Sequence, residues 1–186
     1  KSMTYSSAYF GKSNLSLKQA QENKYKKISQ MVDLKKQNNV LEIGCGWGGF
    51  AEYASKNYNS LLTAITISKE QYEFSKKRID KNGLSNSVNI KLVDYRKIRG
   101  SFDRIVSIEM IEAVGEKYWP VYFSQIKNLL KPNGKAAIQV ITIDDRYFDG
   151  YKKFPDFIQK YIFPGGMLPS MQVLEKPILK SGLKID

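Results

Sequence analysis

Short apolar runs alternate with amphipathic stretches along most of the chain. The apolar runs are typical of buried strands, which we expect at 39–44, 61–66, 88–94, 102–109 and 135–143. Apolar residues at helical spacing predict helices over 15–34, 48–58, 68–83 and 116–134. Because strands alternate with helices, the pattern predicts a doubly wound, mostly parallel α/β sheet with right-handed crossovers.

Residues that begin and end helices support this order. Ser68 caps the helix after the second strand and Gly83 ends it, whereas Pro132 and Gly134 are expected to stop the helix before the last strand. In such sheets ligands bind at the carboxyl ends of the strands. Functional residues are therefore expected in the loops that follow Ile43, Thr66, Val93, Ile108 and Ile143.

The first strand leads into a glycine-rich segment, LEIGCGWGGF, at residues 41–50. The spacing of Gly44, Gly46 and Gly49 matches the dinucleotide fingerprint. The same letters also contain the spacing Gly44-x-Gly46-x-Gly48. The two spacings imply different cofactors.

The residues around this segment separate the two cofactors. A dinucleotide site requires an acidic residue at the end of the second strand, to hold the ribose hydroxyls. That strand ends in TAITISKEQ, where Glu70 already belongs to the following helix. Glu42, two residues before the glycines, suits a cationic ligand and has no obvious use beside a pyrophosphate. The pattern therefore argues against a dinucleotide, which is kept as an alternative.

Composition limits the available chemistry. The 186 residues include no histidine and a single cysteine, Cys45, so an internal disulfide is excluded and neither a metal site nor a Ser-His-Asp triad is expected. No apolar stretch approaches the roughly 20 residues of a membrane span. The first residues lack the apolar core of a signal peptide, so a cytoplasmic protein is expected.

The formal net charge of +12 is large for this length. Such a charge suits nucleic acid or the anionic surface of a bilayer, and solvated lysines also serve simply to keep a protein soluble. No zinc-finger or RNP-type motif accompanies the lysines, so no nucleic-acid partner is expected.

Several segments together carry a family resemblance. They are TYSSAYF near the N-terminus, the glycine-rich segment, TAITISKEQYEFSKKRI, FDRIVSIEMIEAVG and IFPGGMLPS. With them the chain resembles class I S-adenosylmethionine (SAM) methyltransferases, and within these the cyclopropane-fatty-acid synthases and their mycolic-acid relatives. The similarity extends from Met3 to Ser170. It implies a Rossmann-like methyltransferase sheet that lacks its C-terminal strands in this chain, which is expected to be a fragment, an ordered core or an unusually short member.

The resemblance implies that the glycine-rich segment holds the methionyl part of SAM. Two residues near the N-terminus would close over the cofactor, two at the second strand and next helix would approach the ribose, and two after the third strand would contact the adenine. Gly49 is expected to serve close helix packing instead. The expected cofactor-binding residues are Tyr5, Ser6, Glu42, Gly44, Gly46, Gly48, Thr66, Gln71, Asp94 and Tyr95. Apart from the resemblance, Thr66 is an ordinary strand residue and Gln71 a solvated helix residue.

The resemblance also implies the acceptor chemistry. The family methylates an alkene in a lipid acyl chain, and a proton must then leave the new methyl group to form a cyclopropane. In the relatives a bound bicarbonate is the base, positioned by a glutamate that matches Glu112 rather than Glu109. The chain departs from the family at Ser7, Ala113 and Gln139, where cysteine, histidine and histidine are expected.

These departures leave the product open. Ser7 and Gln139 carry donors for an anion such as bicarbonate, so both are kept as catalytic candidates with Glu112. Neither replaces histidine as a proton acceptor near neutral pH. The product is therefore a cyclopropane or a methyl- or methylene-branched chain. The alternatives are a SAM-dependent enzyme with another small-molecule acceptor, and an inactive cofactor- or membrane-binding homologue.

Residues 146–170 follow the last expected strand, where a cover for the acyl chain would lie. An apolar face there is bordered by lysines, and consists of Phe154, Phe157, Ile158, Tyr161 and Ile162. Such a face suits an interfacial surface or a cap packed on its own domain. With the resemblance, the lysines favour an anionic phospholipid membrane. We then expect a cytoplasmic protein bound peripherally to the inner face of the membrane, with a homodimer left open.

Three parts of the chain follow from this interpretation. Residues 1–36 would form a cap segment and helix over the cofactor, residues 37–144 the SAM-binding core, and residues 145–186 the start of the acyl-chain cover.

Overall fold

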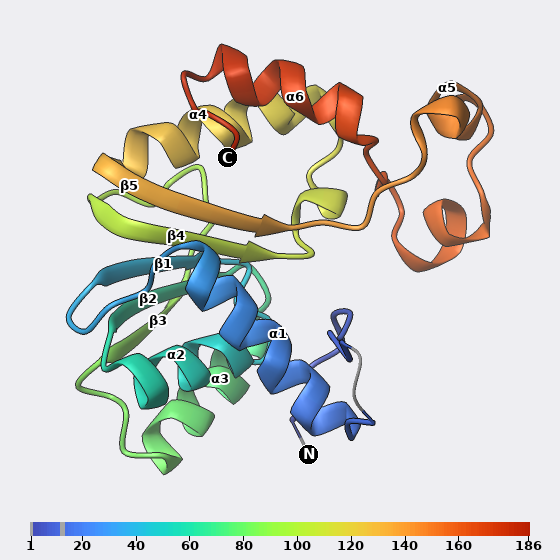
Figure 1. Ribbon diagram of the computed structural model, residues 1–186. Coiled ribbons are helices and arrows are strands. Elements are labelled where there is room, and N and C mark those ends of the chain that lie inside the picture. Colours follow the sequence, from blue (N-terminus) through green and yellow to red (C-terminus); the bar gives the residue numbers. More distant parts are fainter. Residues whose placement is uncertain (1, 12–13) are drawn as a thin grey trace. The chain divides into compact units, whose positions relative to one another are not determined.

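The computed structural model describes residues 2–11 and 14–186 (Figure 1). The strands are β1 (Asn39–Ile43), β2 (Leu61–Thr66), β3 (Val88–Leu92), β4 (Phe102–Ile108) and β5 (Leu130–Gln139). The helices are α1 (Leu17–Met31), α2 (Gly49–Tyr58), α3 (Lys69–Lys81), α4 (Trp119–Leu129), α5 (Asp145–Lys153) and α6 (Met171–Lys180). Single-turn elements are η1 (Ile111–Ala113), η2 (Glu116–Tyr118) and η3 (Ile158–Ile162).

The chain divides into two compact units. The first comprises the residues up to Ile108 together with Leu129–Ile138, and the second comprises Glu109–Asn128 and Gln139–Asp186. The sheet and helices α1 to α3 belong to the first unit, whereas α5, α6 and nearly all of α4 belong to the second. The three functional parts expected from the sequence stay a prediction.

The sheet of the first unit has the strand order β3-β2-β1-β4-β5. Strand β1 is central and pairs in parallel with β2 and β4, so that Ile43 lies opposite both Ile65 and Ser107. Strand β2 pairs in parallel with β3, and β5 runs beside β4 in the same direction (Figure 1). The structure thus confirms the doubly wound parallel α/β fold.

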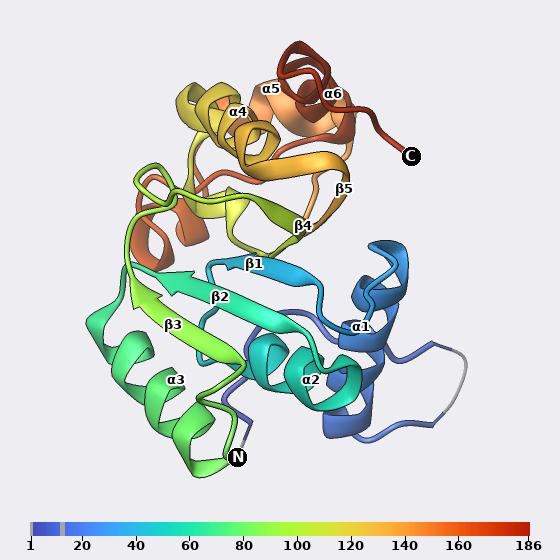
Figure 2. The same cartoon turned by 90° about the vertical axis from the view of Figure 1, so that its left-hand side faces the viewer.

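Helices α1, α2 and α3 lie on one face of this sheet (Figure 2). Their apolar stripes build the core: Tyr25 of α1, Phe50 of α2 and Ile79 of α3 are buried with the inward side chains of the strands. The rings of Tyr25 and Phe50 meet edge to face, 5.8 Å apart. Burial of this apolar surface fixes the strands in register, and with them the loops at their carboxyl ends.

Most expected boundaries agree with the structure to within a few residues. The hydroxyl of Ser68 caps α3 by accepting the backbone N–H of Gln71 at 3.2 Å, as its position predicted. The prediction for the junction between the last expected helix and the last expected strand is wrong. We expected a helix to residue 134 and a strand over 135–143, but α4 ends at Leu129 and β5 spans Leu130–Gln139.

Contacts with the start of β4 explain this difference. Lys131 forms an ion pair with Asp103 at 2.9 Å, and a Cβ atom on Gly134 would lie 3.1 Å from the carbonyl oxygen of Asp103. Pro132 and Gly134 therefore run alongside β4 within the strand rather than end a helix. The loop that follows the strand begins after Gln139 instead of Ile143.

The second unit is built from short helices and connecting loops. The backbone N–H of Ile143 donates to the carbonyl of Pro169 at 2.9 Å, and the carboxylate of Asp145 accepts the N–H of Gln172 at 3.1 Å. These bonds join the start of α5 to the start of α6. Across residues 2–11 and 14–186, none of the helices has both the length and the apolar character needed to cross a bilayer.

Candidate functional site

The glycine loop, residues 44–48, joins β1 to α2 at the carboxyl edge of the sheet. Gly44, Gly46 and Gly48 have φ angles of +79°, +52° and +77°. These angles lie in the left-handed region, which glycine occupies without strain. The alternating glycines are therefore required by the path of the backbone, and a Cβ atom on Gly48 would also lie 3.1 Å from the side chain of Ser75 in α3.

Neighbouring elements hold the loop in place. The backbone N–H groups of Gly44 and Cys45 both donate to the carbonyl of Ile65 in β2, at 3.0 and 2.9 Å. From α3, the hydroxyl of Ser75 donates to the carbonyl of Gly46 at 3.0 Å. The loop is thus fixed by the sheet on one side and by α3 on the other.

Four of the predicted cofactor residues meet beside this loop. The ring of Tyr5 lies 3.6 Å from the position of an added Cβ on Gly46. The side-chain amide of Gln71 donates to the hydroxyl of Tyr5 at 3.3 Å, and the hydroxyl of Thr66 donates to the amide oxygen of Gln71 at 2.8 Å. Tyr5 remains 68% exposed, so its ring is accessible to a ligand.

The N-terminal segment that carries Tyr5 is tied to α1. The side chains of Gln21 and Lys24 donate to the carbonyl and the hydroxyl of Ser6, at 2.7 and 2.6 Å. The hydroxyls of Thr4 and Tyr25 lie 3.1 Å apart within hydrogen-bonding distance. Ser6 is therefore anchored in the same region as Tyr5, and its contact with a cofactor stays a prediction.

Gly49 begins α2 and has a different task from the other glycines. A Cβ atom there would lie 2.5 Å from the hydroxyl oxygen of Tyr25 and 3.1 Å from that of Thr4. Only a glycine lets α1 and the N-terminal segment approach α2 this closely. This supports the expected role of Gly49 in close helix packing.

Glu42 is a buried carboxyl group at the end of β1. It is 3% exposed, and its Oε2 atom has no hydrogen-bond partner within the described part of the chain. Burial raises its pKa to about 8, although the charges of Arg78 and Lys24 act in the opposite direction. An unpartnered acceptor of this kind suits a cationic ligand group.

Asp94 and Tyr95 follow β3 at the same edge of the sheet. The backbone N–H of Val93 donates to the carbonyl of Thr66 at 2.9 Å, which joins this loop to the end of β2. The carboxylate of Asp94 forms an ion pair with Arg96 at 2.5 Å. The hydrogen bond from Arg96 holds the pKa of Asp94 below its usual range. The roles of both residues toward adenine stay predictions.

The acidic loop of the second unit contains Glu109 and Glu112. Glu112 Oε1 accepts the backbone N–H of Ile141 at 2.7 Å, whereas Oε2 is buried and has no hydrogen-bond partner among the described residues. Burial raises the pKa of Glu112, and the nearby charge of Glu109 adds to the shift. The loop thus holds one carboxyl group by a single oxygen and leaves the other oxygen for a ligand.

Gln139 is bound to the other glutamate of this loop. Its side-chain amide donates to Glu109 Oε1 at 2.7 Å, and the backbone N–H of Glu109 donates to the carbonyl of Gln139 at 2.8 Å. Glu109 has a φ angle of +48°, which is uncommon for a residue with a side chain. The family resemblance favoured Glu112 over Glu109 as the catalytic glutamate. Glu109 instead orients Gln139, another catalytic candidate. Ser7 belongs to the first unit, where it is exposed.

Two further residues of the first unit were missed from the sequence. Lys24 is 4% exposed and binds Ser6, and Arg78 contacts both the N-terminal segment and the glycine loop. For Lys24 a signal was present, because it lies four residues from both Ala20 and Ile28 and so falls within the buried stripe of α1. Arg78 contacts backbone carbonyls, which every residue type has, so the sequence gives no signal for these contacts.

Comparison with known proteins places this geometry in a family. The family model described as mycolic acid cyclopropane synthetase matches residues 1–186. The chain is 41% identical over 174 residues to the cyclopropane-fatty-acyl-phospholipid synthase of Escherichia coli K12, covering 91% of this chain and 42% of that protein. It is 39% identical over 155 residues to the tuberculostearic acid methyltransferase UfaA1 of Mycobacterium tuberculosis, covering 83% of this chain and 36% of that protein.

A solved structure supports the same assignment. The chain superposes on mycolic acid cyclopropane synthase CmaA1 complexed with SAH and CTAB with a TM-score of 0.91 and 27% identity, over 99% of this chain and 68% of that one. The fold is that of the class I methyltransferases. Within that class the chain belongs to the mycolic acid cyclopropane synthetase family, which confirms the resemblance seen in its motifs. It spans less than half the length of the two curated relatives.

Proposed function

We propose that this chain provides the SAM-binding core of an enzyme that modifies an unsaturated fatty acyl chain of a phospholipid. The reaction would transfer a methyl or methylene group to the double bond and give a cyclopropane or a branched chain. The observation that carries this proposal is the hydrogen-bonded group of Tyr5, Thr66 and Gln71 beside Gly46, in a chain of this family.

The residues of the first unit fit SAM. Gly46 would leave the backbone open beside Tyr5 for the methionyl part, Gly48 lets the loop pack against Ser75, and the unpartnered oxygen of Glu42 suits the ammonium group. Thr66 and Gln71 offer hydroxyl and amide groups to the ribose. When bound, SAM supplies an electrophilic methyl group on its sulfonium. Complexes of a 27% identical structural relative with SAH are consistent with this cofactor.

The second unit would supply the groups that act on the acceptor. An alkene needs no deprotonation before it attacks, so catalysis depends first on alignment. The buried Oε2 of Glu112 would then accept a hydrogen bond from the hydroxyl of a base such as bicarbonate, or receive the proton itself, since a raised pKa makes the carboxylate a stronger proton acceptor. Gln139, oriented by Glu109, would provide a hydrogen bond to the anion. Ser7 belongs to the first unit, and its catalytic role stays a prediction.

The relatives support two products. One is named a cyclopropane-fatty-acyl-phospholipid synthase and the other a tuberculostearic acid methyltransferase. Because Gln139 is not basic, loss of the proton that closes the ring would depend on Glu112 and a bound anion. If ring closure is slow, a hydride shift and loss of a proton from the new methyl group to the same base would give a methylene-branched chain, whereas a saturated methyl branch would also need a separate hydride donor. Both products remain within the proposed reaction.

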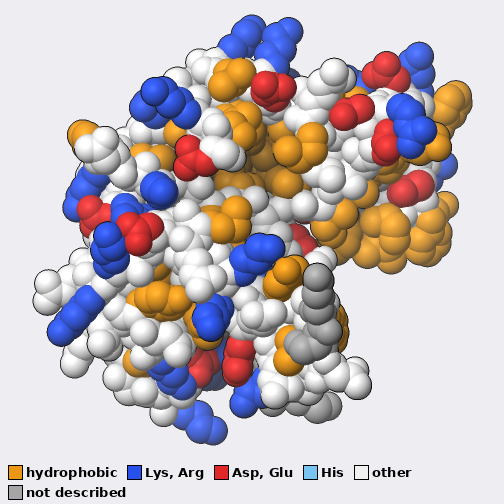
Figure 3. All heavy atoms as spheres, in the orientation of Figure 1, with side chains coloured by type: hydrophobic (Ala, Val, Ile, Leu, Met, Phe, Trp, Pro, Cys, Tyr) orange, Lys and Arg blue, Asp and Glu red, His pale blue; other side chains and the backbone are white. Residues whose placement is uncertain are grey.

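The segment around η3 would contact an anionic membrane surface from the cytoplasmic side. Its apolar side chains are strongly exposed, with Phe154 at 78%, Phe157 at 64% and Tyr161 at 70%. Figure 3 shows hydrophobic side chains gathered over the part of the chain near α5, with basic side chains beside them. An apolar surface bordered by lysines suits a lipid headgroup region better than bulk water.

The decisive experiment uses the full-length protein, methyl-labelled SAM and vesicles of unsaturated anionic phospholipid. We expect label in the extracted acyl chains, and its mass and hydrogen count would separate a ring from a branch. Vesicles with fully saturated chains are the matched control, because they present the same surface without an alkene. Cofactor binding without label in either lipid would favour another small-molecule acceptor or an inactive homologue.

A further inference from the structure

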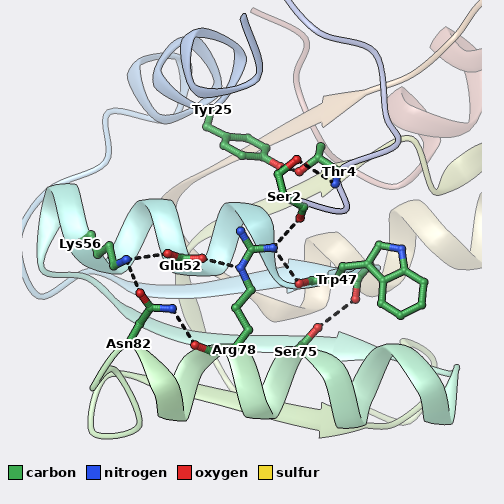
Figure 4. A network of polar contacts seen from close by, with 10 residues as sticks. Ser2, Thr4, Tyr25, Trp47, Glu52, Lys56, Ser75, Arg78 and Asn82 are labelled. Carbon is green, nitrogen blue, oxygen red and sulfur yellow. Dashed lines mark hydrogen bonds and ion pairs between the residues drawn. The ribbon is translucent and has the colours of Figure 1, made fainter. Parts of the chain in front are cut away.

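One arginine joins three separate segments of the first unit. Arg78 lies on α3 (Figure 4), and its side chain is only 19% exposed. Its Nη1 donates to the carbonyl of Ser2 in the N-terminal segment at 2.7 Å and to the carbonyl of Trp47 in the glycine loop at 3.2 Å. Its Nε donates to the carboxylate of Glu52 on α2. The same side chain therefore contacts both the segment that carries Tyr5 and the loop under Tyr5.

The orientation of Arg78 is itself fixed. Glu52 also accepts from Lys56, and Lys56 donates to the side-chain oxygen of Asn82 at 2.6 Å (Figure 4). Partial burial opposes ionisation of Glu52, but the hydrogen bonds from Lys56 and Arg78 outweigh it and lower the pKa. Glu52 thus stays charged near neutral pH and holds the guanidinium in one position.

The N-terminal segment depends on polar contacts at this end. An open cavity of about 950 Å³ lies along it and is lined in part by Ser2, Met3, Gly49 and Arg78. Because apolar packing is incomplete there, the bond from Arg78 to Ser2 holds one side of Tyr5. On the other side Ser6 is held by Lys24. Tyr5 lies between these two anchors.

We propose that Arg78 is a positioning residue for the cofactor site: it holds the N-terminal segment closed over the glycine loop. The proposal rests on the proposed function, since SAM is the ligand that the closed segment would cover. A guanidinium suits this task because its rigid fork serves several acceptors at once. Without it, the segment would populate open states, and the apparent affinity for cofactor would fall with the closed fraction.

The test compares Arg78→Gln with Lys77→Gln, which removes the same charge from an exposed position on the same helix. We expect the Kd for SAH, measured by titration calorimetry, to rise about tenfold for Arg78→Gln and to stay unchanged for Lys77→Gln. In the ligand-free protein, backbone amides of residues 2–11 should exchange faster with solvent deuterium in Arg78→Gln only. Arg78→Lys should give an intermediate Kd, because an ammonium group cannot reproduce the fork.

A double variant separates positioning from a general loss of stability. If Arg78 acts by holding Tyr5 over the loop, Arg78→Gln should weaken SAH binding much less when Tyr5→Ala is already present. Fully additive effects, or an unchanged Kd for Arg78→Gln, would overturn the proposal. If the unmodified chain bound no SAH at all, the proposed function would fail as well, so the two failures are distinguishable.

Discussion

The cofactor site and the acidic loop are held in different ways. The glycine loop is fixed by backbone geometry: positive φ angles at Gly44, Gly46 and Gly48, and two N–H groups that share one carbonyl of β2. The two carboxyl groups of the acidic loop are each held by one side-chain bond, from Ile141 to Glu112 and from Gln139 to Glu109, beside the backbone bond from Glu109 to Gln139. We therefore expect changes in the glycine loop to alter binding and stability together, and changes in the acidic loop to alter chemistry alone.

The largest effect should come from the acidic loop. Glu112→Gln keeps the shape of the side chain but removes the titratable group, and we expect turnover to fall about 10²- to 10⁴-fold. The Kd for SAH should stay within about twofold of the unmodified protein. Labelled-lipid assays and calorimetry measure the two quantities. Glu116→Gln, which removes an ion pair with Lys152 in the same unit, is the matched control. Equal loss of turnover and cofactor binding would contradict the role given to Glu112.

The next effect tests the glycine loop. Gly46 has φ +52°, so Gly46→Val forces a β-branched residue into the left-handed region at a cost of about 1–3 kcal/mol. We expect the Kd for SAH to rise about 100-fold or more, because the side chain also projects beside Tyr5. Gly83→Val is the control: Gly83 has φ +67° but nothing lies within 4 Å of an added Cβ. Comparable loss of SAH binding in both variants would mean that strain alone is responsible.

A smaller effect concerns the packing beneath the loop. Gly49→Ala should lower the free energy of unfolding by about 1–3 kcal/mol, because the new methyl group would overlap the hydroxyl of Tyr25. Tyr25→Phe removes that oxygen, so the double variant should lose less than the sum of the two single changes. Denaturant unfolding measures all three. Strictly additive losses would show that another contact is responsible.

The smallest effect for a single step of one pH unit is a pH dependence from Glu42. Its carboxyl has a pKa of about 8 when folded, against an ordinary value of 4.5. Between these values the folded state holds a proton that the unfolded state releases, so this group's contribution to stability is present at low pH and is lost as pH rises toward 8. The loss is at most about 1.4 kcal/mol per pH unit.

Glu42→Gln isolates that contribution. Its free energy of unfolding should depend less steeply on pH than that of the unmodified protein, over roughly pH 5.5 to 7.5. Urea titrations at several pH values measure the slope. Identical slopes would mean that Glu42 titrates near its ordinary pKa.

Sequence reasoning predicted the glycine loop and the ends of β1 and β2 better than the contacts of the acidic loop. A run of glycines can be read directly from the sequence. Because a parallel sheet brings its strand ends to one edge, the end of β2 also predicts where Thr66 and Gln71 lie. The start of β5 could not be predicted from the sequence, because a proline and a glycine normally end a helix. Contacts with Asp103 make Pro132 and Gly134 part of a strand here. The bond between Gln139 and Glu109 joins residues thirty positions apart, and no local pattern encodes it.

Strand β5 has a practical consequence for handling this protein. Within the described residues β5 lies at the edge of the sheet, and half of its positions are exposed. Its outer row of peptide groups is a template to which a second polypeptide can add by strand pairing. Concentrated solutions of these 186 residues should therefore tend to self-associate through that edge. A version of the protein in which another segment covers this edge should therefore stay in solution at higher concentration.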